Sequence, residues 1–531
     1  MDDSCKHQDK LEEAQPALLP EASLWQRSPL VPRQDKPPVR LKVVRRDQMV
    51  IRTLDVERLL ELQHPARAIW ELVGKFDLSH FYGAIAAVQG QAGRSPHDPR
   101  LLISLWLYSY MKGIVSAREI EKRCEHDPAY IWLTGAEKVC AHTLSDYRTA
   151  HEEALKDLFI QHLAALEKAG LVDLRQVTQD GTKISAAAGA DTFRKKEKIE
   201  EHLQRAQKRV EELNRAAAEK DSESHTQQAL AAQQRAAREQ LDTLEKALAE
   251  VEELQKTAKK PEEVRVSITD PEARIMQHSN GGYGPSYNLQ LTTDTQQTVI
   301  VSVDVTQDYN DAGQLQPAME RVQEEAGQVP EQVIADGGYT SRSNIVAMEE
   351  SGIDLIGPVP DGRVQKETLY KIRGVAAEFR PEAFHFDPDR NCYTCPAGKS
   401  LPYQRKNVLP GQTKYFYQAK REDCQSCVHR PQCCPKSKSG RSLVRAEDSA
   451  EVQRFRAKME TEAGKALYKK RGAVAEFPNL CIKERFGVRR FSVRGLAKVK
   501  IEGLWLALTF NVQQWMRLCW LPGKLQGWAA A

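Results

Sequence analysis

The sequence lacks any apolar run that approaches the roughly 20 residues needed to cross a bilayer. Its longest candidate, residues 101–111, is interrupted by two serines and two tyrosines. The first residues, MDDSCKHQDKLEEAQ, also lack the basic segment and following apolar stretch of a secretory signal. We therefore expect neither secretion nor membrane insertion, and we expect a cytoplasmic protein.

A strong excess of charge of one sign is also missing, because 77 Lys and Arg face 73 Asp and Glu, for a net charge of +4. That balance is too small to indicate a partner by itself. Charged residues make up 28% and hydrophobic ones 41%, which is typical of globular chains rather than disordered or fibrous ones. Since domains usually hold roughly 100 to 200 residues, the length predicts about two to four units.

Glycine and proline are absent from residues 190–260. Apolar residues recur there in steps of 4 and 3 in two arms, 199–213 and 237–251, on either side of the polar stretch 219–228. This pattern predicts an antiparallel helical hairpin or an intermolecular coiled coil. A solvated structural arm and a dimerisation element both fit it.

Helical patterns also fill the chain before this segment. Asp98-Pro99 is an N-cap followed by a first-turn proline, Gly113 ends that helix, and Ser116 begins another over residues 117–124. A third helical stretch is predicted over residues 143–168. Short helices with tight turns fit a helix-turn-helix-like module and a plain helical bundle equally well.

From residue 286 to 358 the pattern becomes that of alternating strands and helices. Together with a short strand expected over residues 174–179, the predicted order is strand, long helical insertion, strand, strand, helix, strand, helix, strand. The helical hairpin is therefore expected to interrupt a sheet domain.

Two aspartates, each followed at once by glycine, stand at the expected ends of two of these strands: Asp180 in VTQDGTK and Asp336 in VIADGGY. Neighbouring strand ends can hold two carboxylates at a fixed separation, which is costly unless a cation lies between them. Carboxylate oxygens suit Mg²⁺ or Mn²⁺, and two such ions about 3.5–4 Å apart activate the attacking oxygen and stabilise the leaving oxygen at phosphorus. A single Asp-Gly pair is more often a turn, but two at corresponding strand ends favour a metal site.

A third carboxylate is expected from a helix packed on the sheet. Residues 451–477 are predicted to be helical, with Glu476 at the end. Tyr468, Arg471 and Lys483 flank it, and DNA phosphates passing over the metal ions would explain cations beside a metal-binding acid. A solvated charged helix is the simpler interpretation of this segment in isolation.

Taken together, these segments resemble bacterial insertion-sequence transposases of the DDE type, whose catalytic core has the RNase H-like fold. The resemblance covers roughly residues 55–515. It rests on the N-terminal helical segment and on several later motifs, which are QDGTKISA, YNLQLTTD, VTQDYNDAGQL, ADGGYTSRSN, the Tyr–Arg–Glu–Lys signature and RFGVRRFSVRGLAKVKIEGLWLALTFNVQQW.

The resemblance implies that Asp180, Asp336 and Glu476 bind the metal ions, and that Tyr468, Arg471 and Lys483 contact or position DNA. It also implies an α/β fold, in which an RNase H-like mixed sheet follows an all-helical N-terminal DNA-binding domain. The commoner signature has three residues between Arg and Glu, whereas four stand here between Arg471 and Glu476. Glu484 and, less favourably, Glu462 are the alternatives for the third acid.

Six of the eleven cysteines lie within 43 residues, in two C-x-x-C pairs followed by Cys433-Cys434. The pairs, Cys392/Cys395 and Cys424/Cys427, predict a structural zinc site, and Cys433 or Cys434 could replace one member. Disulfides fit a cytosolic chain poorly. The related transposases carry a similar cysteine cluster between the second and third acids.

Basic charge is concentrated near the C-terminus, where residues 436–500 hold 18 Lys and Arg against 7 Asp and Glu, a net of +11. Arg489, Arg490 and Arg494 are interleaved there with apolar residues, which predicts a phosphate-binding surface rather than charge that only aids solubility.

We therefore expect a transposase that binds the terminal inverted repeats of its element and joins the cut ends to target DNA. Double-stranded DNA, two Mg²⁺ or Mn²⁺ ions, a structural Zn²⁺ and a homodimer on DNA are the expected partners, with no membrane and with nucleoid association when DNA is bound. A metal-dependent nuclease without joining activity and an inactive DNA-binding regulator are the alternatives.

The expected divisions of the chain are a leader (1–54), helical domain (55–170), first core part (171–190), hairpin (191–262), core (263–360), cysteine-rich insertion (361–445), last core part with the third acid (446–515) and tail (516–531).

Overall fold

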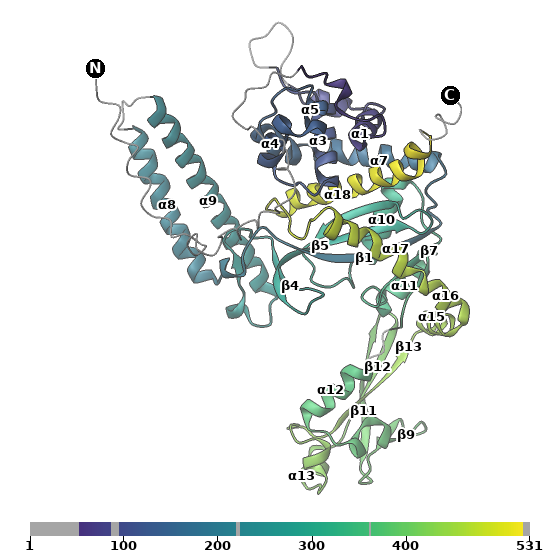
Figure 1. Cartoon of the computed structure of the whole chain (residues 1–531). Helices are drawn as coiled ribbons and strands as arrows, with labels where there is room; N and C mark the ends of the chain where they lie inside the picture. The colour runs from purple at the N-terminus through teal and green to yellow at the C-terminus, as the bar shows by residue number, and fades with distance from the viewer. Residues whose placement is uncertain (1–52, 86–94, 219–223, 360–362, 524–531) are drawn as a thin grey trace, which may run out of the picture. The chain divides into compact units, whose positions relative to one another are not determined.

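A computed structural model of the chain describes residues 53–85, 95–218, 224–359 and 363–523 (Figure 1). Nearly all of the predicted leader, half of the predicted tail and the middle of the predicted hairpin lie outside these residues. Within the described ranges, no helix is both long enough and apolar enough to span a bilayer.

Short helices precede the first strand, as the sequence predicts. Asp98 caps α3 by accepting a hydrogen bond from the Arg100 amide at 2.8 Å, and Gly113 follows that helix with a positive φ of 73°. The stretch predicted as one helix over 143–168 is two helices, because the chain leaves helical geometry at His151. The helices are α1 (Pro65–Val73), α2 (Ser79–Gly83), α3 (Pro99–Met111), α4 (Ala117–His126), α5 (Pro128–Thr134), α6 (Ala141–Ala150) and α7 (Glu152–Lys168).

A mixed sheet follows, with the strand order β6–β5–β1–β7–β8 and with β4 paired to the beginning of β5. β5 runs antiparallel to both β6 and β1, whereas β1, β7 and β8 are parallel. This order and these directions are those of the RNase H-like fold, so the expected fold class is confirmed. The strands are β1 (Gln176–Ser185), β4 (Arg274–Gln277), β5 (Tyr283–Asp294), β6 (Ile300–Thr306), β7 (Gln332–Ala335) and β8 (Asp354–Ile356).

Helices α10 (Leu315–Ala326) and α11 (Arg342–Glu350) connect the later strands, and α18 (Leu496–Trp515) packs on β6 and on the N-terminal helices α3 and α7. One continuous hydrophobic cluster runs from Ile69 on α1 through Trp106 on α3 and Trp505 on α18 to Leu289 on β5. The N-terminal helices and one face of the sheet therefore share a single core.

Two expectations about local structure are wrong. The first strand does not end at Asp180, because its antiparallel pairing with β5 continues to Ser185. The helix predicted over residues 451–477 is three helices that break near Thr461 and Lys470, so Glu476 lies inside the third of them. These helices are α15 (Ala450–Glu460), α16 (Glu462–Lys469) and α17 (Arg471–Leu480), followed by the π-helical turn η7 (Cys481–Arg485).

Two further groups of elements interrupt the sheet in sequence. Helices α8 (Lys196–Ala218) and α9 (Ser224–Thr257) run side by side between the two-stranded pair β2 (Phe193–Arg194) and β3 (Val266–Ser267) (Figure 1). The cysteine-rich segment holds a separate antiparallel sheet in the order β13–β12–β11–β10–β9. Its elements are α12 (Arg363–Arg373), β9 (His385–Asp387), β10 (Cys392–Thr394), β11 (Ser400–Leu409), β12 (Gln412–Gln418), α13 (Arg421–Gln425), α14 (Arg430–Cys433) and β13 (Ser442–Asp448).

Candidate active site

The register of the parallel pair β1 and β7 places the two predicted aspartates beside each other. The last paired residues of the two strands are Gln179 and Ala335. Asp180 and Asp336 are the next residues on each strand. The sheet therefore brings the two carboxylates together where β7 ends, although β1 itself continues.

The guanidinium of Arg471 lies between all three predicted acids. Its Nη2 atom donates to Asp180 Oδ1 at 3.0 Å and lies 3.7 Å from Asp336 Oδ2. Its Nη1 atom lies 3.9 Å from Glu476 Oε1. The three carboxylates thus surround one positive charge, and Arg471 itself is largely buried.

Helix α17 carries Glu476 and Asn479 three residues apart, which is the spacing of one helix face, and Lys483 follows four residues later in η7. Pro478 stands inside this helix, where its ring removes one backbone hydrogen bond, and the next turn is π-helical. Asn479 donates from Nδ2 to Asp180 Oδ2 at 2.9 Å. Asn479 was not predicted from the sequence, because no local pattern marks it between Glu476 and Lys483.

Burial governs the charges at this site. It raises the pKa of Asp180 to about 6, where the Arg471 guanidinium acts in the opposite direction and the Asp336 carboxylate adds to the rise. Burial acts to lower the pKa of Arg471, but Asp180 and Asp336 hold it above its usual value. Burial also lowers the pKa of Lys483, which the neighbouring Asp180 carboxylate partly offsets. The pocket is therefore one in which an added cation would stabilise the ionised acids.

A buried polar network that was not predicted from the sequence lies beside Gly181, the residue after the first acid. Asp311 accepts hydrogen bonds from Lys183 Nζ at 3.1 Å and from Gln290 Nε2 at 2.9 Å, and the Tyr339 hydroxyl donates to Gln290 Oε1. A Cβ atom at Gly181 would come within 2.4 Å of Gln290 Nε2 and 2.8 Å of Asp311 Oδ1. Gly181 is thus required by close packing within β1 and not by a turn.

The alternative third acids lie elsewhere. Glu484 is half exposed and pairs with Arg489 at 2.5 Å, and Glu462 is almost fully exposed and pairs with Lys465 at 2.9 Å. Neither has an ion pair with Arg471 among the described residues. The geometry therefore groups Glu476, and not these two, with Asp180 and Asp336.

The predicted DNA-contacting side chains are placed differently from one another. Tyr468 is half-buried on α16, and Lys483 is half-buried beside Asp180. Arg489, Arg490 and Arg494 are exposed, whereas the apolar residues interleaved with them are buried. The alternation of basic and apolar residues predicted from the sequence thus places these three arginines at the surface of a segment that its buried apolar side chains hold in place.

Five of the six clustered cysteines line one small cavity of about 30 Å³, together with His429. These are Cys395, Cys424, Cys427, Cys433 and Cys434. Cys392 is buried at the beginning of β10 and is not among the lining residues. None of the six forms a disulfide.

As the side chains stand, no group of three or more His, Cys, Asp or Glu in the described ranges is arranged to hold a metal ion. At the triad, the guanidinium of Arg471 supplies the positive charge between the carboxylates. The donor set of three carboxylates nevertheless fits a hard divalent ion.

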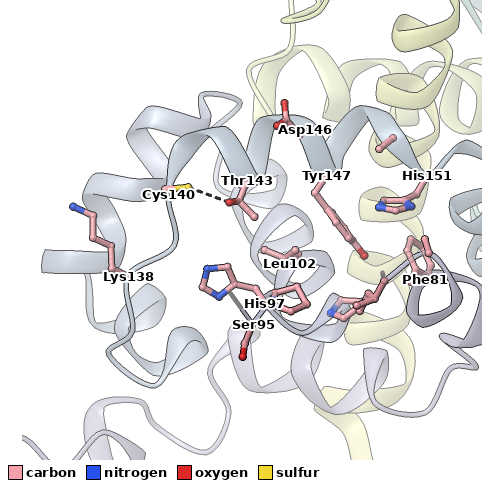
Figure 2. A pocket seen from close by; sticks show the side chains of 15 residues that line it. Phe81, Ser95, His97, Leu102, Lys138, Cys140, Thr143, Asp146, Tyr147 and His151 are labelled. Atoms are coloured by element: carbon pink, nitrogen blue, oxygen red, sulfur yellow. Dashed lines mark hydrogen bonds between the residues drawn. The ribbon is translucent and has the colours of Figure 1, made fainter. Parts of the chain in front are cut away.

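A larger cavity of about 740 Å³ lies among the N-terminal helices, and none of the three acids lines it (Figure 2). His97, Thr143, Tyr147 and His151 point toward it, and Cys140 Sγ lies 3.0 Å from Thr143 Oγ1. The described contacts do not connect this cavity with the triad.

Two segments match known protein families. Residues 394–516 match a family described as "Transposase DDE domain", and residues 54–150 match a family described as "Transposase domain". The resemblance to DDE-type transposases is confirmed. The first match includes Tyr468, Arg471, Glu476 and Lys483, whereas Asp180 and Asp336 lie outside both. DDE transposases generally use divalent metal ions.

Among solved structures, a piggyBac transposase synaptic complex with hairpin DNA is similar over 85% of this chain and 75% of that chain, with 9% sequence identity and a TM-score of 0.31. A likeness of this size carries no residue of that structure over to this chain. No curated protein matches the chain.

Proposed function

We propose that this transposase binds the ends of its own insertion sequence, cuts DNA there and joins the freed ends to a target, with Asp180, Asp336 and Glu476 as the metal-binding acids. The observation that carries the proposal is the meeting of these three carboxylates around the single guanidinium of Arg471, with distances of 3.0, 3.7 and 3.9 Å. Three acids held at one point by a cation are the donor set that two divalent ions require.

Both steps are phosphoryl transfers. Water attacks a phosphodiester at the element end and releases a 3′-hydroxyl and a 5′-phosphate. The 3′-hydroxyl then attacks a phosphodiester of the target, forms a new phosphodiester there and displaces a 3′-hydroxyl of the target strand. Two Mg²⁺ or Mn²⁺ ions, when bound by the three carboxylates, would activate the attacking oxygen and stabilise the leaving oxygen. Lys483 and Tyr468 orient the strand beside the acids, and Arg471 moves from the acids to the phosphate.

The exposed arginines Arg489, Arg490 and Arg494 hold the DNA backbone on the flank of the site. Support comes from their exposure beside buried Phe486 and Phe491, which fixes the segment that carries them. Cations at fixed positions neutralise phosphates without reading sequence.

Recognition of the element ends is assigned to the N-terminal helices. Pairing of protomers on DNA is assigned to the α8–α9 hairpin.

The cysteine cluster is proposed to hold a structural zinc ion. The shared cavity favours Cys395, Cys424 and Cys427 as ligands, with Cys433 or Cys434 in place of Cys392. Metal analysis of the purified chain tests this, with about one zinc per chain expected, lost in Cys395→Ser and Cys424→Ser and retained in Cys392→Ser.

The reaction is tested with duplexes that carry the DNA flanking this reading frame, a labelled target plasmid and Mg²⁺. The proposal expects nicking at the element end, followed by labelled joined products. Cleavage without joined products, at concentrations at which the chain is bound to the element ends, would establish a nuclease instead. Binding without cleavage would establish a regulator.

A further inference from the structure

We propose that Asn479 is a positioning residue that fixes the orientation of the Asp180 carboxylate. In this orientation the Oδ1 atom faces Arg471, or the divalent ion that takes its place, and the Oδ2 atom faces Asn479. This inference rests on the proposed metal-binding role of Asp180. It concerns a residue outside the Tyr–Arg–Glu–Lys signature that contacts the first acid directly.

Each oxygen of Asp180 has a different partner on α17. Arg471 Nη2 donates to Oδ1 at 3.0 Å, and Asn479 Nδ2 donates to Oδ2 at 2.9 Å. The carboxylate cannot rotate about its terminal bond without breaking both contacts. Its orientation is therefore set by one helix that also carries Glu476.

The two partners differ in how easily they can leave. Asn479 is short and more than nine-tenths buried, and its Nδ2 atom also donates to the Ala475 carbonyl oxygen one turn earlier at 3.2 Å. Arg471 is long, is the first residue of α17, and divides its guanidinium among three carboxylates. Asn479 is thus the fixed contact, and Oδ1 is the oxygen that a divalent ion reaches when Arg471 moves.

The amide can adopt only one orientation here. Both neighbours of Nδ2 are acceptors, so the nitrogen must face them, and the Asn479 Oδ1 atom is left buried with no partner among the described residues. An unsatisfied buried carbonyl lowers stability. Asn479 also lines a cavity of about 450 Å³ together with Thr182, Glu476 and Lys483. Fold stability alone does not explain this amide, whereas a role beside the acids does.

Without the Asn479 contact, Asp180 could turn both oxygens toward Arg471. Arginine and carboxylate form a strong bidentate pair when their geometry allows it. A divalent ion would then compete with a tighter internal partner, and its binding would weaken.

The test measures Mn²⁺ binding to the full chain by titration calorimetry without DNA, and thermal unfolding in the presence of a chelator. Asn479→Leu removes the donor at nearly constant volume, and Asn479→Ala is a second variant should the first fail to fold. Both are expected to weaken Mn²⁺ binding about tenfold, as loss of a hydrogen bond to a charged group implies. The control is Asn511→Ala, because Asn511 is a fully buried residue whose side-chain amide accepts from the Ile300 amide and donates to the Ile300 carbonyl oxygen. This control should lower the unfolding temperature and leave Mn²⁺ affinity unchanged.

Wild-type Mn²⁺ affinity in both Asn479 variants, with or without a lower unfolding temperature, would overturn the positioning role and leave the proposed reaction standing. If the wild-type chain bound no Mn²⁺ at millimolar concentration, the metal-binding role of Asp180 itself would be overturned as well.

Discussion

Arg471 makes the contacts that a divalent ion would have to replace, because its Nη2 atom donates to Asp180 and lies near Asp336 while its Nη1 atom lies near Glu476. An internal cation of this kind offsets the repulsion among the three acids. Arg471 and an added ion are then competitors for the same oxygen of Asp180.

Replacing Arg471 with glutamine removes this competitor. In the Arg471→Gln variant we expect Mn²⁺ to bind about tenfold more tightly without DNA, since one charge-assisted hydrogen bond no longer opposes it. DNA cleavage should nevertheless fall, because the phosphate loses a contact. Calorimetric titration measures the affinity, and unchanged or weaker Mn²⁺ binding would contradict the competition.

The raised pKa of Asp180 predicts a pH dependence of stability. Because its folded-state pKa, about 6, lies above its usual value of 3.8, the protonated carboxyl favours the folded state. This contribution is fully present below pH 3.8, is lost as the pH rises through 6, and amounts to about 3 kcal/mol. Relative to Asp180→Asn in chelator, the wild-type chain should thus lose about that much unfolding free energy between pH 4 and 7. Parallel stability curves for the two proteins would show that the pKa is not raised.

The sequence predicted the acids because each has its own local pattern, whereas Asn479 has none. Asp180 and Asp336 follow apolar stretches and precede glycine, and Glu476 sits in a spaced set of Tyr, Arg and Lys. Asn479 matters through a contact with a residue 299 positions earlier in the chain. A partner so distant in sequence is fixed only by the packing of α17 against β1.

At the scale of elements, the succession of strands and helices along the chain was predictable and the strand ends were not. Periodicity marks where strands and helices occur. Periodicity does not show that β1 extends beyond the end of its parallel partner β7, where β5 continues to pair with β1. The helix predicted over 451–477 is also broken, because Thr461 caps a new helix by accepting a hydrogen bond from the Gly464 amide at 3.1 Å.

The packing of β1 against the polar network makes a prediction about two glycines. Gly181→Ala should destabilise the chain by about 1–3 kcal/mol, because its Cβ would overlap Gln290, Asp311 and Tyr339. The matched change Gly472→Ala, on an open face of α17 where a Cβ meets nothing within 4 Å, should be neutral or stabilising by about 0.5–1 kcal/mol. Chemical denaturation of both variants measures this, and an equal effect of the two changes would refute the role given to Gly181.

At the scale of the whole described chain, the N-terminal helices and the sheet share one core through α18. A buried polar cluster crosses the same junction. Glu502 on α18 accepts from the Ser492 amide at 2.9 Å and lies 3.9 Å from Arg148 Nη1 on α6. The division into a helical domain and a core domain, drawn from the sequence, remains a prediction, but these contacts join the two parts closely.

Loss of the Glu502 carboxylate should therefore weaken both parts at once. Glu502→Ala leaves Arg148 buried without its carboxylate and is expected to cost about 3–5 kcal/mol. Hydrogen exchange should rise together in α3, α6 and α18, whereas the exposed-pair control Glu201→Ala on α8 should change stability by less than about 1 kcal/mol. Faster exchange confined to α18 would argue against a shared core.

Asp180, Asp336 and Glu476 are proposed to act as one centre, and the function proposed for the chain depends on it. The direct measurement is the single-turnover rate of Mg²⁺-dependent cleavage of an element-end duplex by the three alanine variants, with Glu484→Ala as the matched control. We expect each of the three to lose at least about a thousandfold in rate, because removal of any member of a unit that acts together abolishes most of its effect, and we expect Glu484→Ala to retain cleavage. Full activity in Glu476→Ala, or loss of activity in Glu484→Ala with Glu476→Ala unaffected, would contradict the assignment of Glu476 to this centre.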